Sequence, residues 1–267
     1  MGKNKRNQQK VAKNSHSDLL WRDILEFKNH LSKYMAAYII NLSGLESAVN
    51  AVKTSSTGNW QYKVEKIIFR DLFLNNSGKS ENSSLEMTIK MSGVYHNNTT
   101  PICDFLNEYC LEFLVKQQTE EQTIKNAYRF ERHIYTHGDD TPEFIHPVYH
   151  LQYGGDKLTN DEDFETGDVL FCDAPRILHP PMDIILGIDF ILANYYSFHL
   201  CEEYKQLLND NHYQQIIKNA KDRFWKPYFL GLAANFIGTN QYSFHGINHL
   251  SVDKTFAQNL LAYKKEN

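Results

Sequence analysis

The sequence has no apolar run long enough to cross a membrane. A spanning helix needs roughly 18 or more consecutive apolar residues, and no segment of the 267-residue chain approaches that length. The first thirteen residues also lack the apolar stretch of a secretory signal, because they are basic and polar. These absences predict a cytoplasmic protein that makes no use of a membrane.

Cysteine is scarce, and the common signatures of catalytic and cofactor sites are missing. None of the four cysteines has the C-x-x-C spacing of a zinc site, and their scatter does not suggest a disulfide framework. The sequence also lacks a glycine-rich phosphate loop, a G-x-S-x-G elbow and an H-E-x-x-H pair. We therefore expect reduced thiols, no cofactor and no metal ion.

Charge of either sign is nearly balanced, with one local exception. The formal net charge is −4, which gives the molecule no overall field suited to wrapping a nucleic acid backbone. The first thirteen residues nevertheless contain five cations and no acid: Lys3, Lys5, Arg6, Lys10 and Lys13. Like charges repel and keep a segment extended, so we expect residues 1–16 to form a basic, disordered leader; the alternative is a nucleic-acid-binding arm.

Helical periodicity marks the start of the folded region. Leu20, Ile24, Phe27 and Leu31 repeat at the spacing of one helix face, which predicts an amphipathic helix from Ser17 onward. A second helix is expected from about residue 43 to residue 53. The prediction is a pair of helices over residues 17–53.

The period then changes from 3.6 to 2. Residues 60–74 and 84–95 predict a hairpin, and residues 108–117 and 124–135 alternate in the same way. In residues 84–95, for example, Leu85 and Met87 alternate with Glu86 and Thr88. We expect an antiparallel meander over residues 60–153 with one face exposed to solvent.

The C-terminal part is again helical. Residues 181–197 are apolar almost all round, which predicts a buried helix. Helices are also expected over 198–208, over 212–236 with a break at Pro227, and over 253–264. The order of elements predicts an α+β fold, with a single domain over 17–267 in which helices 181–264 form a C-terminal bundle.

Two histidines stand four residues apart at the end of the expected sheet. On a helix His146 and His150 could bind one metal ion, but the neighbouring Val148 and Tyr149 favour a strand. Four residues of a strand span ~13 Å at ~3.3 Å per residue, which is too far for one ion. Both side chains would still point to the same face, opposite Tyr149.

An arginine and a third histidine precede the apolar helix. Prolines suit a helix start, so Arg176 and His179 would lie near a helix N-terminus, which attracts anions. One hypothesis is a phosphate or carboxylate pocket in which Arg176 binds the anion and His146 or His150 acts as general acid or base. The alternative is architectural, with these histidines and prolines fixing a loop corner. The candidate catalytic residues are His146, His150, Arg176 and His179.

A second candidate site lies within residues 218–226. Lys218, Lys221 and Arg223 accompany Phe224 and Trp225, and basic residues with aromatics can bind a nucleic acid strand by charge and stacking. On a helix the aromatic rings can equally face the core while the lysines face water. Nucleic acid binding is therefore expected, if at all, through this patch or the basic leader.

Several short motifs carry a family resemblance. They are Tyr128-Arg129-Phe130, the His-Pro-x-x-His-Leu-x-x-Gly run from His146 to Gly154, Pro175-Arg176-Ile177, and the apolar segment from Phe190 to Tyr195. Their order, over about residues 120–200, resembles a family of uncharacterised bacterial proteins associated with phage-defence and toxin–antitoxin-like gene neighbourhoods. The resemblance implies a cellular setting rather than a mechanism.

Two functions are consistent with these observations. The leading hypothesis is a component of a bacterial phage-defence-type system that acts as a protein-binding subunit or adaptor, with a partner encoded nearby or a second copy of itself. The alternative is a metal-independent, RNase-like enzyme that acts on a phosphate-containing substrate through the His/Arg pocket. Convergence of the four candidate side chains in one concave site distinguishes the two.

Overall fold

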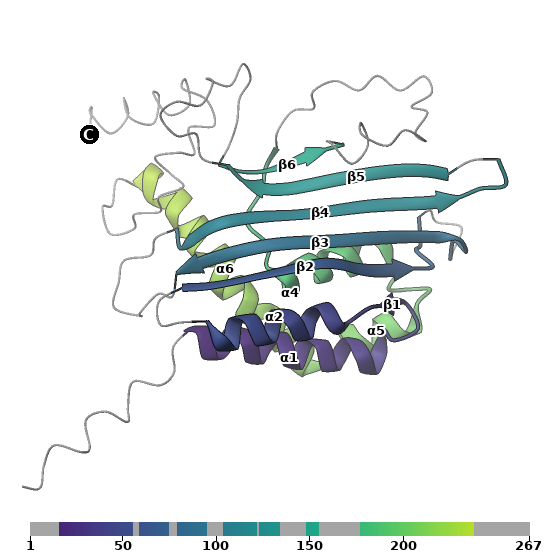
Figure 1. Cartoon of the computed structure of the whole chain (residues 1–267), viewed down its shortest axis with the longest axis horizontal. Helices are drawn as coiled ribbons and strands as arrows, with labels where there is room; N and C mark the ends of the chain where they lie inside the picture. Colours follow the sequence, from purple (N-terminus) through teal and green to yellow (C-terminus); the bar gives the residue numbers. More distant parts are fainter. Residues whose placement is uncertain are drawn as a thin grey trace, which may run out of the picture.

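One antiparallel sheet of seven strands organises the described part of the chain (Figure 1). The computed structural model describes residues 16–55, 59–74, 79–94, 104–121, 123–133, 148–154 and 177–237. Strands follow one another in the order β1-β2-β3-β4-β5-β6-β7, and each pairs antiparallel with the next. The predicted α+β meander between N-terminal and C-terminal helices is confirmed.

Within the described residues, two helices flank the first strand and three follow the last one. The N-terminal elements are α1 (His16–Tyr34), β1 (Ile39–Ile40) and α2 (Ser43–Thr54). The remaining strands are β2 (Asn59–Arg70), β3 (Ser83–Val94), β4 (Leu106–Gln118), β5 (Thr123–Arg132), β6 (Tyr149–Tyr153) and β7 (Ile177–Leu178). The chain then forms α4 (Ile184–Tyr195), α5 (Glu202–Leu208) and α6 (Asn211–Ile237).

The alternation along the strands divides the sheet into two chemically different faces. Met87 and Ile89 of β3 are buried, and Ile89 lies opposite the buried Leu111 of β4. Each such side chain contributes roughly 1.5–3 kcal/mol when it leaves water. The face packed on the helices is therefore the core face, and we call the other one the outer face.

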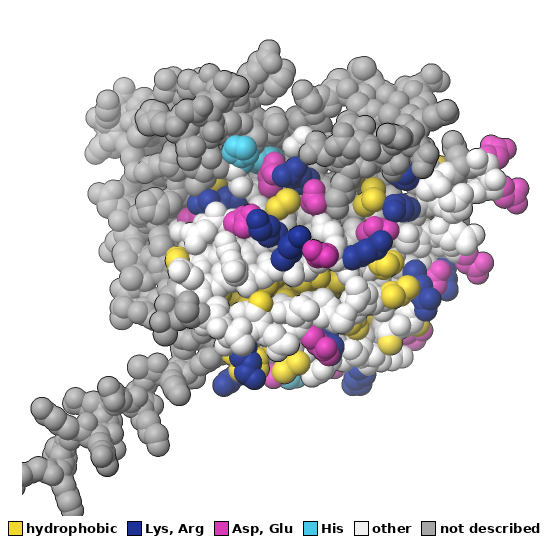
Figure 2. Space-filling view, viewed as in Figure 1, with side chains coloured by type: hydrophobic (Ala, Val, Ile, Leu, Met, Phe, Trp, Pro, Cys, Tyr) yellow, Lys and Arg dark blue, Asp and Glu magenta, His cyan; other side chains and the backbone are white. Residues whose placement is uncertain are grey.

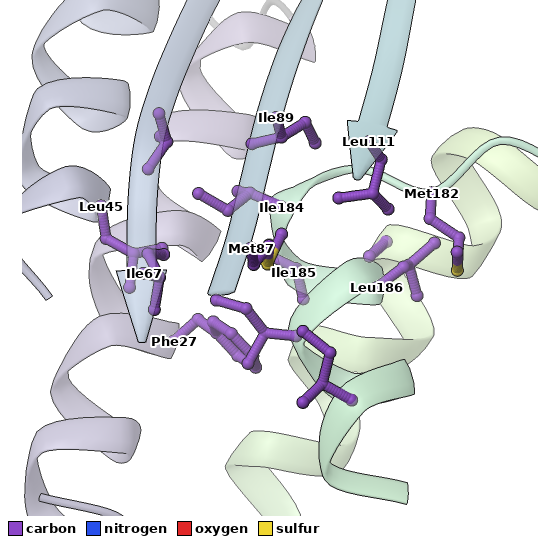
Figure 3. Packing of buried hydrophobic residues seen from close by; sticks show 14 of the residues in the cluster. Phe27, Leu45, Ile67, Met87, Ile89, Leu111, Met182, Ile184, Ile185 and Leu186 are labelled. Atoms are coloured by element: carbon purple, nitrogen blue, oxygen red, sulfur yellow. The ribbon is translucent and has the colours of Figure 1, made fainter. Parts of the chain in front are cut away.

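Helix α4 packs closely on the middle of the core face. Ile184, Ile185 and Leu186 lie beside Met87 and Leu111 in the hydrophobic cluster (Figure 3). The helix can come this close because residue 187 is glycine: a Cβ there would lie 3.0 Å from Met87 Cε and 3.1 Å from Leu111 Cδ2. Residues 184–188 are all buried, which explains why this part of the segment is apolar all round.

The predicted apolar stripe of α1 is confirmed. Leu20, Ile24, Phe27 and Leu31 are all buried, and Phe27 stacks on Tyr213 of α6 with ring centroids 5.7 Å apart. Helix α2 lies against β2, and Gly44 leaves no room for a Cβ beside Val64 of that strand. The N-terminal helices therefore belong to the same core as the C-terminal ones.

The outer face is polar, with both signs of charge interspersed (Figure 2). Glu86 of β3, for example, pairs with Lys66 of β2 at 3.1 Å and with Lys116 of β4 at 3.0 Å. Because they are partly exposed, such pairs contribute little to stability. Their effect is to keep this face soluble and to offset like charges on neighbouring strands.

Several predicted boundaries need correction, including that of α5, which begins at Glu202 instead of residue 198. The sheet extends beyond 60–153, because β1 and β7 add short strands at its two edges. Helix α4 begins at Ile184 instead of Pro181, and α6 continues through Pro227 without a break. Buried Phe224 and Tyr228 on either side of this proline hold α6 against the core, which offsets the lost hydrogen bond. The expected leader and the expected helix over 253–264 lie outside the described residues.

Candidate functional site

His150 lies on the outer face within a row of polar side chains. It is opposite Glu131 of β5, which in turn is opposite Cys110 of β4. His150 Nε2 is 3.1 Å from Glu131 Oε1, and the histidine side chain has no exposed surface. This confirms the predicted strand parity, with Tyr149 buried on the core face. It also places the imidazole where a substrate in solvent does not reach it.

Glu131 pairs with two side chains on this face, the imidazole of His150 and the guanidinium of Arg129. Its second oxygen, Oε2, is 2.8 Å from Arg129 Nη2. Burial would raise the pKa of Glu131, but the hydrogen bond from His150 and the charge of Arg129 outweigh burial and lower it. Burial raises the pKa of the adjacent Cys110 thiol to about 11, so the thiol stays protonated at neutral pH and is a poor nucleophile.

His179 lies on the other side of the sheet. Its ring centroid is 4.8 Å from that of Phe130 and 6.4 Å from that of Phe190 in α4, so it packs between sheet and helix. Its Nδ1 is 2.7 Å from the carbonyl oxygen of Pro180. Burial lowers the pKa of His179 and so favours the neutral ring.

The structure therefore does not bring His150 and His179 together. Leu178 pairs with His150 across the sheet, and the next residue points to the opposite face because side chains alternate along a strand. His146 and Arg176 lie outside the described residues. A role for these four residues in one pocket stays a prediction. The two described histidines instead contact other side chains of the protein, Glu131 for His150 and Phe130 for His179.

The start of α4 carries its own anion. Asp183 precedes the first turn, and its Oδ1 accepts a hydrogen bond from the backbone N–H of Leu186 at 2.9 Å. Asp183 is fully buried, and burial raises its pKa to about 6 although the charge of Arg223 opposes this shift. The helix N-terminus at which a phosphate or carboxylate was expected to bind is therefore already capped by the side chain of Asp183. An Asp directly before Ile184-Ile185 is the sequence signal that identifies such a cap.

The three candidate cations of the 218–226 patch, Lys218, Lys221 and Arg223, have different surroundings. Lys218 pairs with Asp222 at 2.6 Å, and Lys221 Nζ lies 5.2 Å from the ring centroid of Trp225. Arg223 forms an ion pair with Asp23 of α1 in which both side chains are about nine-tenths buried. The patch is therefore divided: Lys218 is exposed, whereas Arg223 ties α6 to α1.

The aromatic residues of this patch are structural. Phe224 is buried in the core. The Trp225 indole Nε1–H donates to the carbonyl oxygen of Pro181 at 3.0 Å, which links α6 to the segment before α4. The structure therefore agrees with the alternative in which these two rings face the core.

An exposed apolar and aromatic surface surrounds the C-terminal end of α4, and the sequence did not reveal it. Tyr128 of β5 and Tyr153 of β6 meet edge to face with centroids 5.5 Å apart, and Tyr195 of α4 adjoins both. Tyr153 is 45% exposed and Ile124, on the same strand face as Tyr128, is 49% exposed. Three tyrosines far apart in sequence thus form one cluster.

A surface cavity of about 590 Å³ adjoins the last turn of α4. Its lining includes Phe73, Leu74 and Tyr196, and two of its members are strongly exposed: Phe198 at 43% and Leu200 at 57%. We name this cavity and the tyrosine cluster together the α4-end surface, defined by Ile124, Tyr128, Tyr153, Tyr195, Phe198 and Leu200. It combines apolar area with phenolic hydroxyls.

No three His, Cys, Asp or Glu side chains of the described segments lie together in a way that could hold a metal ion. No helix in the described part is both long and apolar enough to cross a bilayer. Comparisons with protein-family models, curated proteins and solved structures find no match to this chain.

Proposed function

We propose that this chain is a protein-binding subunit or adaptor of a bacterial phage-defence-type system, and that it binds its partner through the α4-end surface. The observation that carries the proposal is exposure at one helix end: Phe198 and Leu200 are exposed in the lining of the cavity, and Tyr153 is exposed beside Tyr195, the last residue of α4. The resemblance of residues 120–200 to the defence-associated family supports the cellular setting.

The composition of the α4-end surface favours a protein partner. Tyrosine offers a large contact area and a hydroxyl at a low cost in side-chain entropy, and it is enriched at protein interfaces. Tyr128 already has one polar neighbour, because its hydroxyl accepts from Asn126 Nδ2 at 3.1 Å. The cluster is thus held in place before a partner arrives, which reduces the entropy lost on binding.

The described catalytic candidates give less support to the enzyme hypothesis. A general acid or base must come within hydrogen-bond reach of the reacting group. His150 is enclosed beside Glu131, and His179 packs on Phe130 behind the sheet. The alternative RNase-like reading therefore depends on His146 and Arg176.

Co-purification with the products of neighbouring genes tests the proposal. We expect a stable complex with the wild-type chain, and Tyr153→Asp or the double change Phe198→Asp/Leu200→Asp to weaken it by roughly 30-fold or more, as for an interface hot spot of about 2 kcal/mol. Phe229→Asp is the matched control, because Phe229 is 51% exposed on α6 and lies outside this surface. The control should bind like the wild type.

Two results would contradict the proposal. Equal binding by wild type and the double variant would remove the α4-end surface as the interface. Cleavage of RNA by the wild-type chain that is lost in His150→Ala and in Arg176→Ala, with folding intact, would favour the enzyme instead.

A further inference from the structure

One arginine of α6 faces two carboxylates from different elements inside the fold. Arg223 pairs through Nη1 with Asp23 of α1, and each of the two side chains is about nine-tenths buried. Its charge also acts on Asp183, which precedes α4 and is fully buried. The start of α4 is thus linked electrostatically to the contact between α1 and α6, through a buried cluster of two acids and one base.

The hydrogen bonds of this cluster are incomplete. Asp183 Oδ1 caps α4, whereas the second oxygen, Oδ2, is buried and has no hydrogen-bond partner among the described residues. Arg223 Nε and Nη2 are likewise buried donors without a partner in that part of the chain. Leaving a buried donor or acceptor unpaired is costly. The cluster therefore contains one acid oxygen and two guanidinium nitrogens that are free to change partner.

The other titratable neighbours of Asp183 are phenols. The Tyr62 hydroxyl of β2 accepts the backbone N–H of Ile184 at 3.1 Å, and the Tyr109 hydroxyl of β4 accepts that of Met182 at 3.2 Å. Burial raises the pKa of both phenols, so they keep their protons near neutral pH. Met182 and Ile184 belong to the hydrophobic cluster (Figure 3). Neither phenol can therefore supply a charge that balances an ionised Asp183.

An ionised Asp183 competes with Asp23 for the single cation. Burial raises the pKa of Asp183 to about 6; the charge of Arg223 opposes this shift and the charge of Asp23 adds to it. Asp183 is therefore mostly neutral at pH 5 and mostly ionised at pH 8. In the ionised state two carboxylates share one guanidinium, which leaves one negative charge in the cluster uncompensated.

We propose that Asp23, Arg223 and Asp183 form a proton-controlled latch that holds α6 against α1 and against the start of α4. When Asp183 is protonated, the cluster contains one cation and one anion, and the latch is closed. Loss of the proton adds a buried negative charge, which water relieves when α6 separates and Asp183 becomes hydrated. The open state binds the proton less tightly than the closed state, so rising pH favours opening.

The direction and size of this pH dependence follow from the two states of Asp183. Its contribution to closure is complete below the ordinary pKa of about 3.9 and is lost as pH rises through about 6. With the ordinary pKa in the open state, the open fraction rises about tenfold between pH 5 and pH 8. Asn caps a helix as well as Asp does but carries no charge, so Asp183→Asn removes the dependence.

The latch is at the N-terminal end of α4, whereas the proposed partner surface is at its C-terminal end. The two proposals can therefore fail separately. Loss of the partner complex in the α4-end variants leaves the titration of Asp183 unchanged, and absence of the latch leaves the partner surface in place.

Carbon-13 NMR of the full-length chain measures the proton on Asp183 directly. We expect the Asp183 Cγ signal, assigned by its loss in Asp183→Asn, to titrate with a midpoint near 6. Asp23→Asn should lower this midpoint by about 0.5 or more because it removes the competing charge, and Arg223→Met should raise it by a similar amount. Arg223→Lys keeps the charge and should titrate closer to the wild type.

Hydrogen exchange measures the opening of α6. The amide exchange rates of residues 220–226, each divided by the intrinsic rate at the same pH, report the open fraction. We expect this fraction to be about tenfold larger at pH 8 than at pH 5 in the wild type, and to change by less than about twofold in Asp183→Asn. These amides should also be less protected than those of Met87 and Ile89 in β3, because the latch opens α6 without unfolding the sheet.

A matched control removes a different carboxylate from the same region. Asp222 is on α6, one residue before Arg223, but it is exposed and pairs with Lys218. Asp222→Asn should therefore keep the pH dependence of the wild type. Circular dichroism checks that each variant is folded, and Asp23→Asn with Asp183→Asn still tests the latch where Arg223→Met does not fold.

Four results would overturn the latch. One is an Asp183 Cγ signal without a midpoint between pH 5 and pH 7. Another is a midpoint that stays or rises in Asp23→Asn, which would show that burial alone sets it. A third is exchange in α6 whose pH dependence persists in Asp183→Asn or is lost in Asp222→Asn. The fourth is equal protection of α6 and β3, which would show that α6 does not open separately.

Discussion

His150 and Glu131 are directly opposite each other on neighbouring strands, and their side chains meet on the outer face with Nε2 3.1 Å from Oε1. Arg129 approaches the same carboxylate from the other side at 2.8 Å. One carboxylate thus pairs with an imidazole and a guanidinium on the outer face. Because these side chains pair with one another, the polar groups of Glu131 and His150 can be buried on this face.

Glu131→Gln tests this cluster. The pKa of Glu131 is lowered in the fold, because its partners outweigh burial, so its charged form adds stability above the unfolded pKa of about 4.3 and loses it as pH falls through the lower folded pKa. We expect the variant to be less stable by about 1–3 kcal/mol at pH 7 and closer to wild type at pH 3. Urea unfolding at both pH values measures this. Glu108→Gln, on an exposed pair with Lys90, should change stability by less than about 0.5 kcal/mol.

Asp183→Asn should have the opposite sign. Burial raises the pKa of Asp183 to about 6, so its contribution to stability is complete below the unfolded value of about 3.9 and is lost as pH rises through 6. Asn caps a helix as well as Asp does but carries no charge. We expect the variant to be about 1–3 kcal/mol more stable than wild type at pH 8 and nearly equal at pH 4, as measured by chemical denaturation. Destabilisation at pH 8 would show that the buried charge is compensated.

Arg223→Ala should destabilise the chain strongly. Arg223 and Asp23 form a largely buried ion pair between α6 and α1, and removing one partner leaves the other charge uncompensated. The expected loss is about 3–5 kcal/mol by chemical denaturation. Lys218→Ala, on the same helix, should be nearly neutral because Lys218 and Asp222 are exposed. Equal stability of the two variants would contradict the division of the patch.

Gly44→Ala should be destabilising although alanine is the better helix former. A Cβ at residue 44 would lie 2.5 Å from Val64 Cγ1, and a β-branched side chain in a strand has little freedom to move. We expect a loss of about 1–3 kcal/mol from overpacking, which exceeds the roughly 1 kcal/mol gained in helix propensity. Thermal unfolding measures it, with Ser47→Ala at an exposed position of α2 as the control.

The fold could be predicted from local periodicity, because segments with the helical period of 3.6 and segments with the strand period of 2 are well separated along the chain. Alternation in β3 and the 3.6-residue stripe of α1 each identify a buried face, and both faces are buried in the structure. The predictions were wrong where tertiary packing outweighed a local sequence signal. Pro227 stays within α6 because tertiary packing of Phe224 and Tyr228 holds the helix on both sides of it.

The candidate sites depend on contacts that periodicity does not encode. Strand parity correctly placed His150 on the outer face, but the alternation could not be carried to His179 because the intervening register was unknown. Similarly, Lys218 and Arg223 of the 218–226 patch are close in sequence, yet the turn of the helix directs Arg223 to Asp23 and Lys218 to solvent.

The sequence by itself determined which faces of the helices and strands are buried, because apolar spacing reflects the geometry of each element and needs no knowledge of its neighbours. Only the tertiary structure decided which polar side chains meet. Tyr128, Tyr153 and Tyr195 form one cluster, and Lys53 of α2 lies over the ring of Trp21 of α1. Both contacts exist because strand pairing and helix packing join residues that are distant in the chain.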